Sequence, residues 1–180
     1  MSKLMILTLV PLAILLPLHA SLVWAPSTMR EGLRRFPRHR WIGWALAGGA
    51  VVWAAWLLRD MPLGRFDYLK QFLVPAAVVF AGLVLYTMEE LLAPRALGAL
   101  LLLYPAPLLE AARLHESPWS VVMSLVAYVM VVKGMALLLS PYLFRKATER
   151  VLATDTACRV IGSVGLAFDA ALLLLALVVY

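Results

Sequence analysis

The chain has 180 residues, of which 64% are hydrophobic, and its formal net charge is +6. A soluble globular domain is usually about 45–50% apolar, and the excess here lies in long blocks, which predicts membrane-spanning helices. Most of the Lys and Arg residues lie between these blocks, where they favour contact with anionic lipid headgroups and argue against nucleic-acid binding. The single cysteine, Cys158, excludes an internal disulfide and a cysteine-rich metal cluster.

The first predicted span covers residues 4–24. Leu18–Ala20 has the composition of a signal-peptide cleavage site, but the apolar run has about the 20 residues that a full crossing needs, so we expect a retained span. Pro11 and Pro17 lie inside it, as membrane helices allow. The connection 25–40 is rich in arginine, with apolar residues at helical spacing, and this predicts an amphipathic helix on the membrane surface.

The second predicted span covers residues 41–58, and the third runs from about 69 to 88. Small residues recur on the second span at positions that share one face of a helix. They are Gly43, Ala47, Ala50 and Ala54. Small side chains let two membrane helices approach closely, so this stripe predicts a packing face for another helix.

The fourth predicted span, residues 96–109, is irregular. Pro105 and Pro107 lie near its end, and two prolines remove two backbone donors and clash with the preceding turn, which predicts a kink or a break. Broken helices mark binding sites in many transporters. The alternative is a kinked packing helix, and a break without a counterpart elsewhere in the chain favours that alternative.

The fifth and sixth predicted spans, residues 119–139 and 160–180, each contain a charged residue, Lys133 and Asp169. At about 1.5 Å per residue, their expected depths from the basic connection 140–159 are ~12 and ~16 Å. An unpaired charge at such depth costs about 3 kcal/mol or more. We therefore expect an ion pair between them, either as a structural clamp or as an ion-linked site.

The six spans predict one all-α membrane domain, residues 1–180, arranged as three hairpins at about 4–58, 69–112 and 119–180. If the connections after the first, third and fifth spans face the cytoplasm, that side carries ten basic residues and the other side carries five. The positive-inside rule favours this orientation, which places both termini on the non-cytoplasmic side.

Each return span opens with an arginine three residues before a glycine. The arginines are Arg40, Arg95 and Arg159, and the glycines are Gly43, Gly98 and Gly162. We expect each arginine to reach the cytoplasmic interface and each glycine, one turn deeper, to admit a neighbouring helix. The pattern is typical of a duplicated hairpin or of interface chemistry that all three ends share.

The last third of the chain combines Val132–Gly134, a Ser140–Pro141 step, a basic stretch, Arg159–Gly162 and a final apolar run. In these features residues 125–180 resemble the YjeT-like family of small two-helix bacterial inner-membrane proteins of unknown function. That family tends to carry an acidic residue where Lys133 stands. The resemblance implies a bacterial inner-membrane location and a hairpin unit, and it implies no activity.

His19 is a possible axial ligand for a haem or a chlorophyll-type pigment. Haem held by two histidines would need a second one within the membrane, whereas His39 and His115 fall in connections. The sequence lacks a His-Glu-x-x-His motif, a Gly-x-Ser-x-Gly motif and a phosphate loop. It therefore predicts neither an enzyme nor a metal site, and no cofactor is assigned.

The leading functional hypothesis is a non-enzymatic structural or accessory subunit of a larger membrane complex. Its expected partners are other membrane subunits and anionic lipid at the basic connections. The first alternative is a small carrier or channel that uses Lys133 and Asp169. The second is a pigment- or haem-binding subunit that uses His19.

Overall fold

The computed structural model describes residues 2–62, 64–87, 91–151 and 153–180, and this described part of the chain is helical without strands. Six helical segments in it are long and apolar enough to cross a membrane. They are Lys3–Trp24, Arg40–Asp60, Gly64–Leu83, Leu92–Arg113, Ser120–Leu139 and Asp155–Val178. The predicted all-α bundle with six spans is confirmed, and the chain is a multi-pass membrane protein.

The elements follow one another in the order α1 (Lys3–Trp24), α2 (Pro26–Arg35), η1 (Phe36–Arg38), α3 (Arg40–Asp60), η2 (Gly64–Phe72), α4 (Leu73–Thr87), α5 (Leu92–Leu103), α6 (Pro105–Arg113), α7 (Ser120–Leu139), α8 (Tyr142–Val151) and α9 (Asp155–Val178). Two short helices, α2 and α8, occupy the basic connections, where basic and apolar residues alternate at helical spacing. The amphipathic helices expected in these connections are therefore present.

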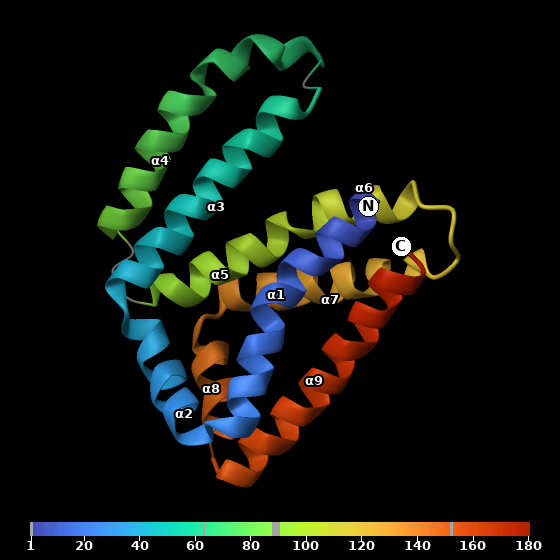
Figure 1. Cartoon of the computed structure of the whole chain (residues 1–180). Helices are drawn as coiled ribbons and strands as arrows, with labels where there is room; N and C mark the ends of the chain where they lie inside the picture. Colours follow the sequence, from blue (N-terminus) through green and yellow to red (C-terminus); the bar gives the residue numbers. More distant parts are fainter. Residues whose placement is uncertain (1, 63, 88–90, 152) are drawn as a thin grey trace.

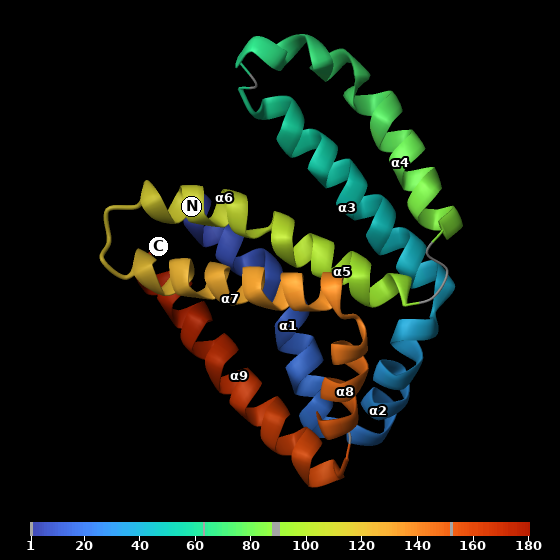
Figure 2. The ribbon, with the colours of Figure 1, turned by 180° about the vertical axis from the view of Figure 1, so that it is seen from behind.

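The spans pair differently from the three predicted hairpins. The first and last spans, α1 and α9, pack along each other, and α5 packs against both α3 and α7 (Figures 1 and 2). Among the described residues, α1 does not pack along α3, α4 does not pack along α5, and α7 does not pack along α9. In the first and third hairpins the physical reason is the surface helix, because ten residues of α-helix, about 15 Å long, separate the spans that they connect.

The main core lies where α1, α6, α7 and α9 meet. Its fully buried side chains include Leu4, Leu108, Met123 and Ala127. These four helices converge at one end of the bundle, on the side opposite α2 and α8 (Figure 1). At that end the Tyr180 hydroxyl donates a hydrogen bond of 2.7 Å to the Trp119 carbonyl, and burial raises the pKa of this phenol above its ordinary value.

Helices α3 and α4, with η2 between them, form an arm that leans away from the rest of the bundle (Figures 1 and 2). Helix α3 joins the bundle through α5, whereas α4 packs along α3 and along no other described span. None of the span Gly64–Leu83 is buried. The arm, residues 40–87, is therefore attached to the bundle by one helix face.

The three glycines of the Arg-x-x-Gly pattern all lie at helix crossings, as predicted. Gly43 lies against α5, Gly98 against α7 and Gly162 against α1. The two backbones approach most closely at the α5–α7 crossing, where a Cβ added to Gly98 would lie 2.9 Å from the carbonyl oxygen of Gly134. Backbone meets backbone there, which only glycine permits.

Candidate functional site: a buried histidine–aspartate pair

The most unusual polar contact in the described structure joins the first and last spans. Nδ1 of His19 on α1 lies 2.7 Å from Oδ2 of Asp169 on α9. The Asp169 side chain is 1% exposed and the His19 side chain is 21% exposed. Ionisable groups inside a membrane are costly unless they are paired, and this contact gives each group its partner.

Helix α9 makes room for the imidazole with glycine. A Cβ added to Gly165, one turn before Asp169, would lie 2.5 Å from the His19 ring. Gly162, one turn further back, packs against the His19 carbonyl and the Leu22 side chain. The His19 ring therefore rests on a glycine-lined surface, and its Nδ1 faces the carboxylate.

The predicted ion pair between Lys133 and Asp169 is wrong. Asp169 faces α1, because the buried side of α9 packs there, and its carboxylate contacts His19 instead. Lys133 is exposed and, within the described part of the chain, forms no ion pair. Helix α7 turns its neighbour Gly134 toward α5, which leaves Lys133 on the outside of the helix.

One carboxylate oxygen of Asp169 has no protein partner. Its Oδ1 is buried without a hydrogen bond among the described residues, while Oδ2 binds His19. A buried polar oxygen without a hydrogen bond is costly and uncommon in folded proteins. The unpaired Oδ1 therefore marks this carboxylate as a candidate functional group.

The candidate axial ligand, His19, is hydrogen-bonded to Asp169 through Nδ1. The other two histidines lie in connections between spans. Nδ1 of His39 accepts a hydrogen bond from the Ile42 amide, and the His115 ring packs on Tyr180. Among the described residues, no group of three or more His, Cys, Asp or Glu side chains could hold a metal ion. Haem or pigment binding by His19 stays a prediction that an absorption spectrum tests.

The predicted kink in the fourth span is confirmed at Tyr104, between α5 and α6. The backbone of Tyr104 stays helical, and its amide donates to the Leu100 carbonyl at 3.0 Å. The backbone therefore stays helical through the junction of α5 and α6 and is not unwound there.

Tyr104 also supplies a hydrogen-bond donor that the first span lacks. Pro11 has no amide hydrogen, so the Leu7 carbonyl four residues earlier has no helical donor. The Tyr104 hydroxyl donates to this carbonyl at 2.5 Å. The Tyr104 hydroxyl thereby replaces the amide donor that Pro11 lacks. The bond holds α1 against the junction of α5 and α6.

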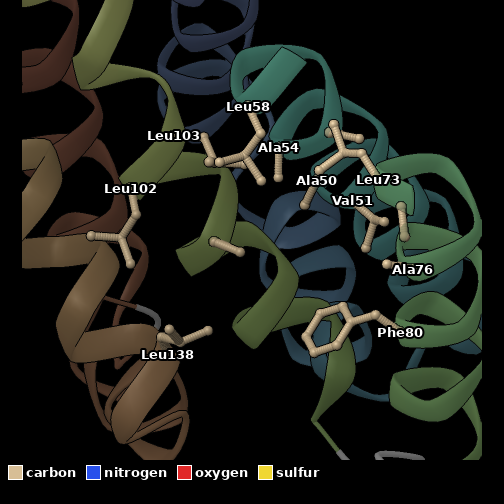
Figure 3. Close-up of a pocket in the computed structure, with 13 residues that line it drawn as sticks. Ala50, Val51, Ala54, Leu58, Leu73, Ala76, Phe80, Leu102, Leu103 and Leu138 are labelled. Atoms are coloured by element: carbon tan, nitrogen blue, oxygen red, sulfur yellow. The ribbon is translucent and has the colours of Figure 1, made fainter. Parts of the chain in front are cut away.

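Only the first half of the predicted small-residue stripe lies at a helix crossing. Gly43, Ala47 and Ala50 are buried, and Ala54 is half-buried. The first two lie where α3 meets α5. Further along α3 the two helices diverge, and Ala50 and Ala54 line a cavity between the arm and the bundle (Figure 3). This arm cavity has a volume of about 600 Å³ and only apolar side chains from α3, α4, α5 and α7 line it.

The predicted interface arginines begin the return spans. Arg40 opens α3, Arg95 lies in the first turns of α5, and Arg159 lies in the first turns of α9. The Arg40 guanidinium stacks over the Trp44 ring at 4.6 Å. An arginine beside a tryptophan at a helix end is typical of a membrane–water interface.

The two surface helices form one layer. The Arg30 guanidinium on α2 lies 2.6 Å from the Asp155 carboxylate at the start of α9. The rings of Phe36, just after α2, and Phe144 on α8 have centroids 5.2 Å apart. These contacts hold α2 and α8 together next to the start of α9. Most of the other basic side chains of α2 and α8 remain exposed.

Comparison of the chain with protein-family models, with curated proteins and with solved structures finds no match. Its function is therefore inferred from the geometry of the described residues alone.

Proposed function

We propose that the chain is a non-enzymatic structural or accessory subunit of a larger complex in a bacterial inner membrane. The observation that carries this proposal is α4, which among the described residues packs along α3 and along no other span, and whose span Gly64–Leu83 has no buried residue. Helices in a membrane associate through close packing of small residues. A span with a single neighbour therefore offers a long surface on which a helix of another subunit can pack.

The glycines support this proposal. Gly98, Gly134 and Gly162 each lie against the backbone or side chains of a neighbouring helix. Gly49 and Gly82, both on the arm, have no atom within 4 Å of an added Cβ. Glycine costs about 1 kcal/mol relative to alanine in a helix, so its presence on the open arm favours close contact with a helix from outside the chain.

Site-directed crosslinking in native membranes tests the proposal. A thiol introduced by Gly82→Cys carries a photoreactive crosslinker on the open side of α4. Val164→Cys on the exposed side of α9 is the matched control, and unmodified protein is the blank, because Cys158 is fully buried. We expect one discrete polypeptide adduct at position 82 and none at position 164. Adducts at neither position would contradict the proposal.

The orientation belongs to the same proposal. The layer of α2 and α8 faces the cytoplasm, because it carries most of the basic residues outside the spans. Ser27 lies exposed on α2. A membrane-impermeant thiol reagent should label Ser27→Cys only after the cells are permeabilised, and labelling in intact cells would reverse the orientation.

A small proton-linked carrier is the second candidate, and the His19–Asp169 pair favours it. Ionisable residues that meet inside a membrane are typical of proton and ion pathways, and this carboxylate has one oxygen without a partner among the described residues. This candidate predicts that Asp169→Asn abolishes a pH-driven flux in proteoliposomes while the protein stays folded. An unchanged flux in the Asp169→Asn variant would rule out the carrier function.

A further inference from the structure

We propose that the arm cavity binds one acyl chain of a membrane phospholipid. The cavity lies between the arm and the α5–α7 pair (Figure 3). It is independent of the surface around Gly82 to which the subunit hypothesis assigns a partner helix.

The chemistry of the lining selects an apolar occupant. All thirteen lining side chains are Ala, Val, Leu or Phe, and examples from the four walls are Ala54, Phe80, Leu102 and Leu138 (Figure 3). A water molecule needs two to four polar partners to stay in a cavity, and these side chains offer none. The walls are spans, so the nearest apolar material outside the protein is the hydrocarbon of the bilayer.

The size of the cavity distinguishes a lipid chain from a helix. Its volume of about 600 Å³ lies within the range of about 300–1,000 Å³ that is typical of ligand pockets. A helix about 10–12 Å wide occupies roughly 100 Å³ per ångström of length, so the cavity would hold little more than one turn of it. A flexible chain fits the same volume along its length. An empty cavity would deprive the lining atoms of dispersion contacts.

A cationic residue follows one of the lining residues directly in the sequence. Leu58 and Leu73 line the end next to the connection between α3 and α4. Arg59 follows Leu58 directly, is exposed, and forms no ion pair within the described residues. The ammonium group of Lys70 is already 3.0 Å from the Asp67 carboxylate. Arg59, the cation next to a lining residue, can bind the phosphate of the lipid whose chain enters the cavity.

Photolabelling with a defined lipid tests this site. The full-length protein is reconstituted in bilayers that contain a phospholipid with a diazirine on one acyl chain, and peptide mass spectrometry locates the adducts. Ala76→Phe places a ring in the cavity from an exposed position of α4. Val78→Phe places the same ring on the opposite, exposed side of α4 and is the matched control.

We expect adducts on the cavity residues of α5, and we expect Ala76→Phe to lower them about tenfold, the ratio that ~1.4 kcal/mol of binding free energy gives. Val78→Phe should leave them unchanged. Adducts spread evenly around α4 and insensitive to Ala76→Phe would overturn the site. Arg59→Gln should lower the labelling while Arg113→Gln does not; equal labelling in these two variants would overturn the role of Arg59 in phosphate binding.

Discussion

Asp169 in the last span binds His19 in the first span, 150 positions away in the sequence, with 2.7 Å between Oδ2 and Nδ1. The contact lies in the C-terminal part of α1 and near the middle of α9, and this helix pair joins the first and last spans of the bundle. It gives a largely apolar helix pair one directional bond, and that bond fixes the rotation and the register of α1 on α9.

A double-mutant cycle measures this bond. His19→Ala and Asp169→Ala should each lower the free energy of unfolding by about 1–3 kcal/mol, because each leaves a buried polar partner unsatisfied. The coupling energy should be about 1–2 kcal/mol, the upper range for hydrogen bonds between membrane helices. Unfolding of the purified protein in mixed micelles by increasing denaturing detergent gives all four values.

Lys133→Met provides the control for that cycle. Lys133 lies on the exposed side of α7 and away from Asp169, so the two substitutions should be additive within about 0.5 kcal/mol. A coupling energy between Lys133 and Asp169 as large as that between His19 and Asp169 would contradict the observed pairing.

Gly165→Ala should break the same contact without removing either partner. The added Cβ would lie 2.5 Å from the His19 ring, so the ring must move and the helices must separate, at a cost of about 1–3 kcal/mol. Gly82→Ala is the matched substitution in open space and should be neutral or stabilising by up to about 1 kcal/mol. Equal effects of the two substitutions on thermal stability would argue against the tight α1–α9 contact.

Gly98→Ala tests the attachment of α5 to α7. The added Cβ would lie 2.9 Å from the Gly134 carbonyl oxygen and 2.9 Å from the Leu138 amide nitrogen, and neither backbone atom can rotate away. We expect a loss of about 1–3 kcal/mol in the free energy of unfolding. Gly49→Ala, where an added Cβ meets no atom within 4 Å, should show no such loss.

Tyr104→Phe should cost about 1–2 kcal/mol, because it leaves the Leu7 carbonyl without a donor inside an apolar bundle. Pro11→Ala supplies the missing amide hydrogen from within α1. In the Pro11→Ala background, Tyr104→Phe should therefore cost less than about 0.5 kcal/mol. The same penalty in both backgrounds would contradict the role of the Tyr104 hydroxyl as the donor that replaces the missing Pro11 amide.

The spans, the kink and the crossing glycines could be predicted because each depends on local sequence. Run length decides which segments cross a membrane, Pro105 bends the helix that contains it, and Gly43 or Gly162 allows close approach whatever its neighbour is. The stripe on α3 likewise predicted a packing face without naming the helix that occupies it.

The pairing of the spans could not be read in the same way. Lys133 and Asp169 share a depth and adjacent spans, but depth does not say which way a side chain faces around its helix axis. The angular positions of the residues around the helix axis give the missing signal. His19 shares one face of the first span with the buried residues Leu4, Thr8 and Leu12. A histidine on the buried face of a span needs a polar partner, and Asp169 lies on the buried face of α9 with Gly162.

The mass of the particle that mild detergent extracts from native membranes tests the subunit hypothesis most directly. We predict a particle in which this 19.9 kDa chain is accompanied by another polypeptide in fixed ratio, and in which Gly82→Cys crosslinks to that polypeptide. A stable monomer that carries lipid but no second chain would contradict the hypothesis.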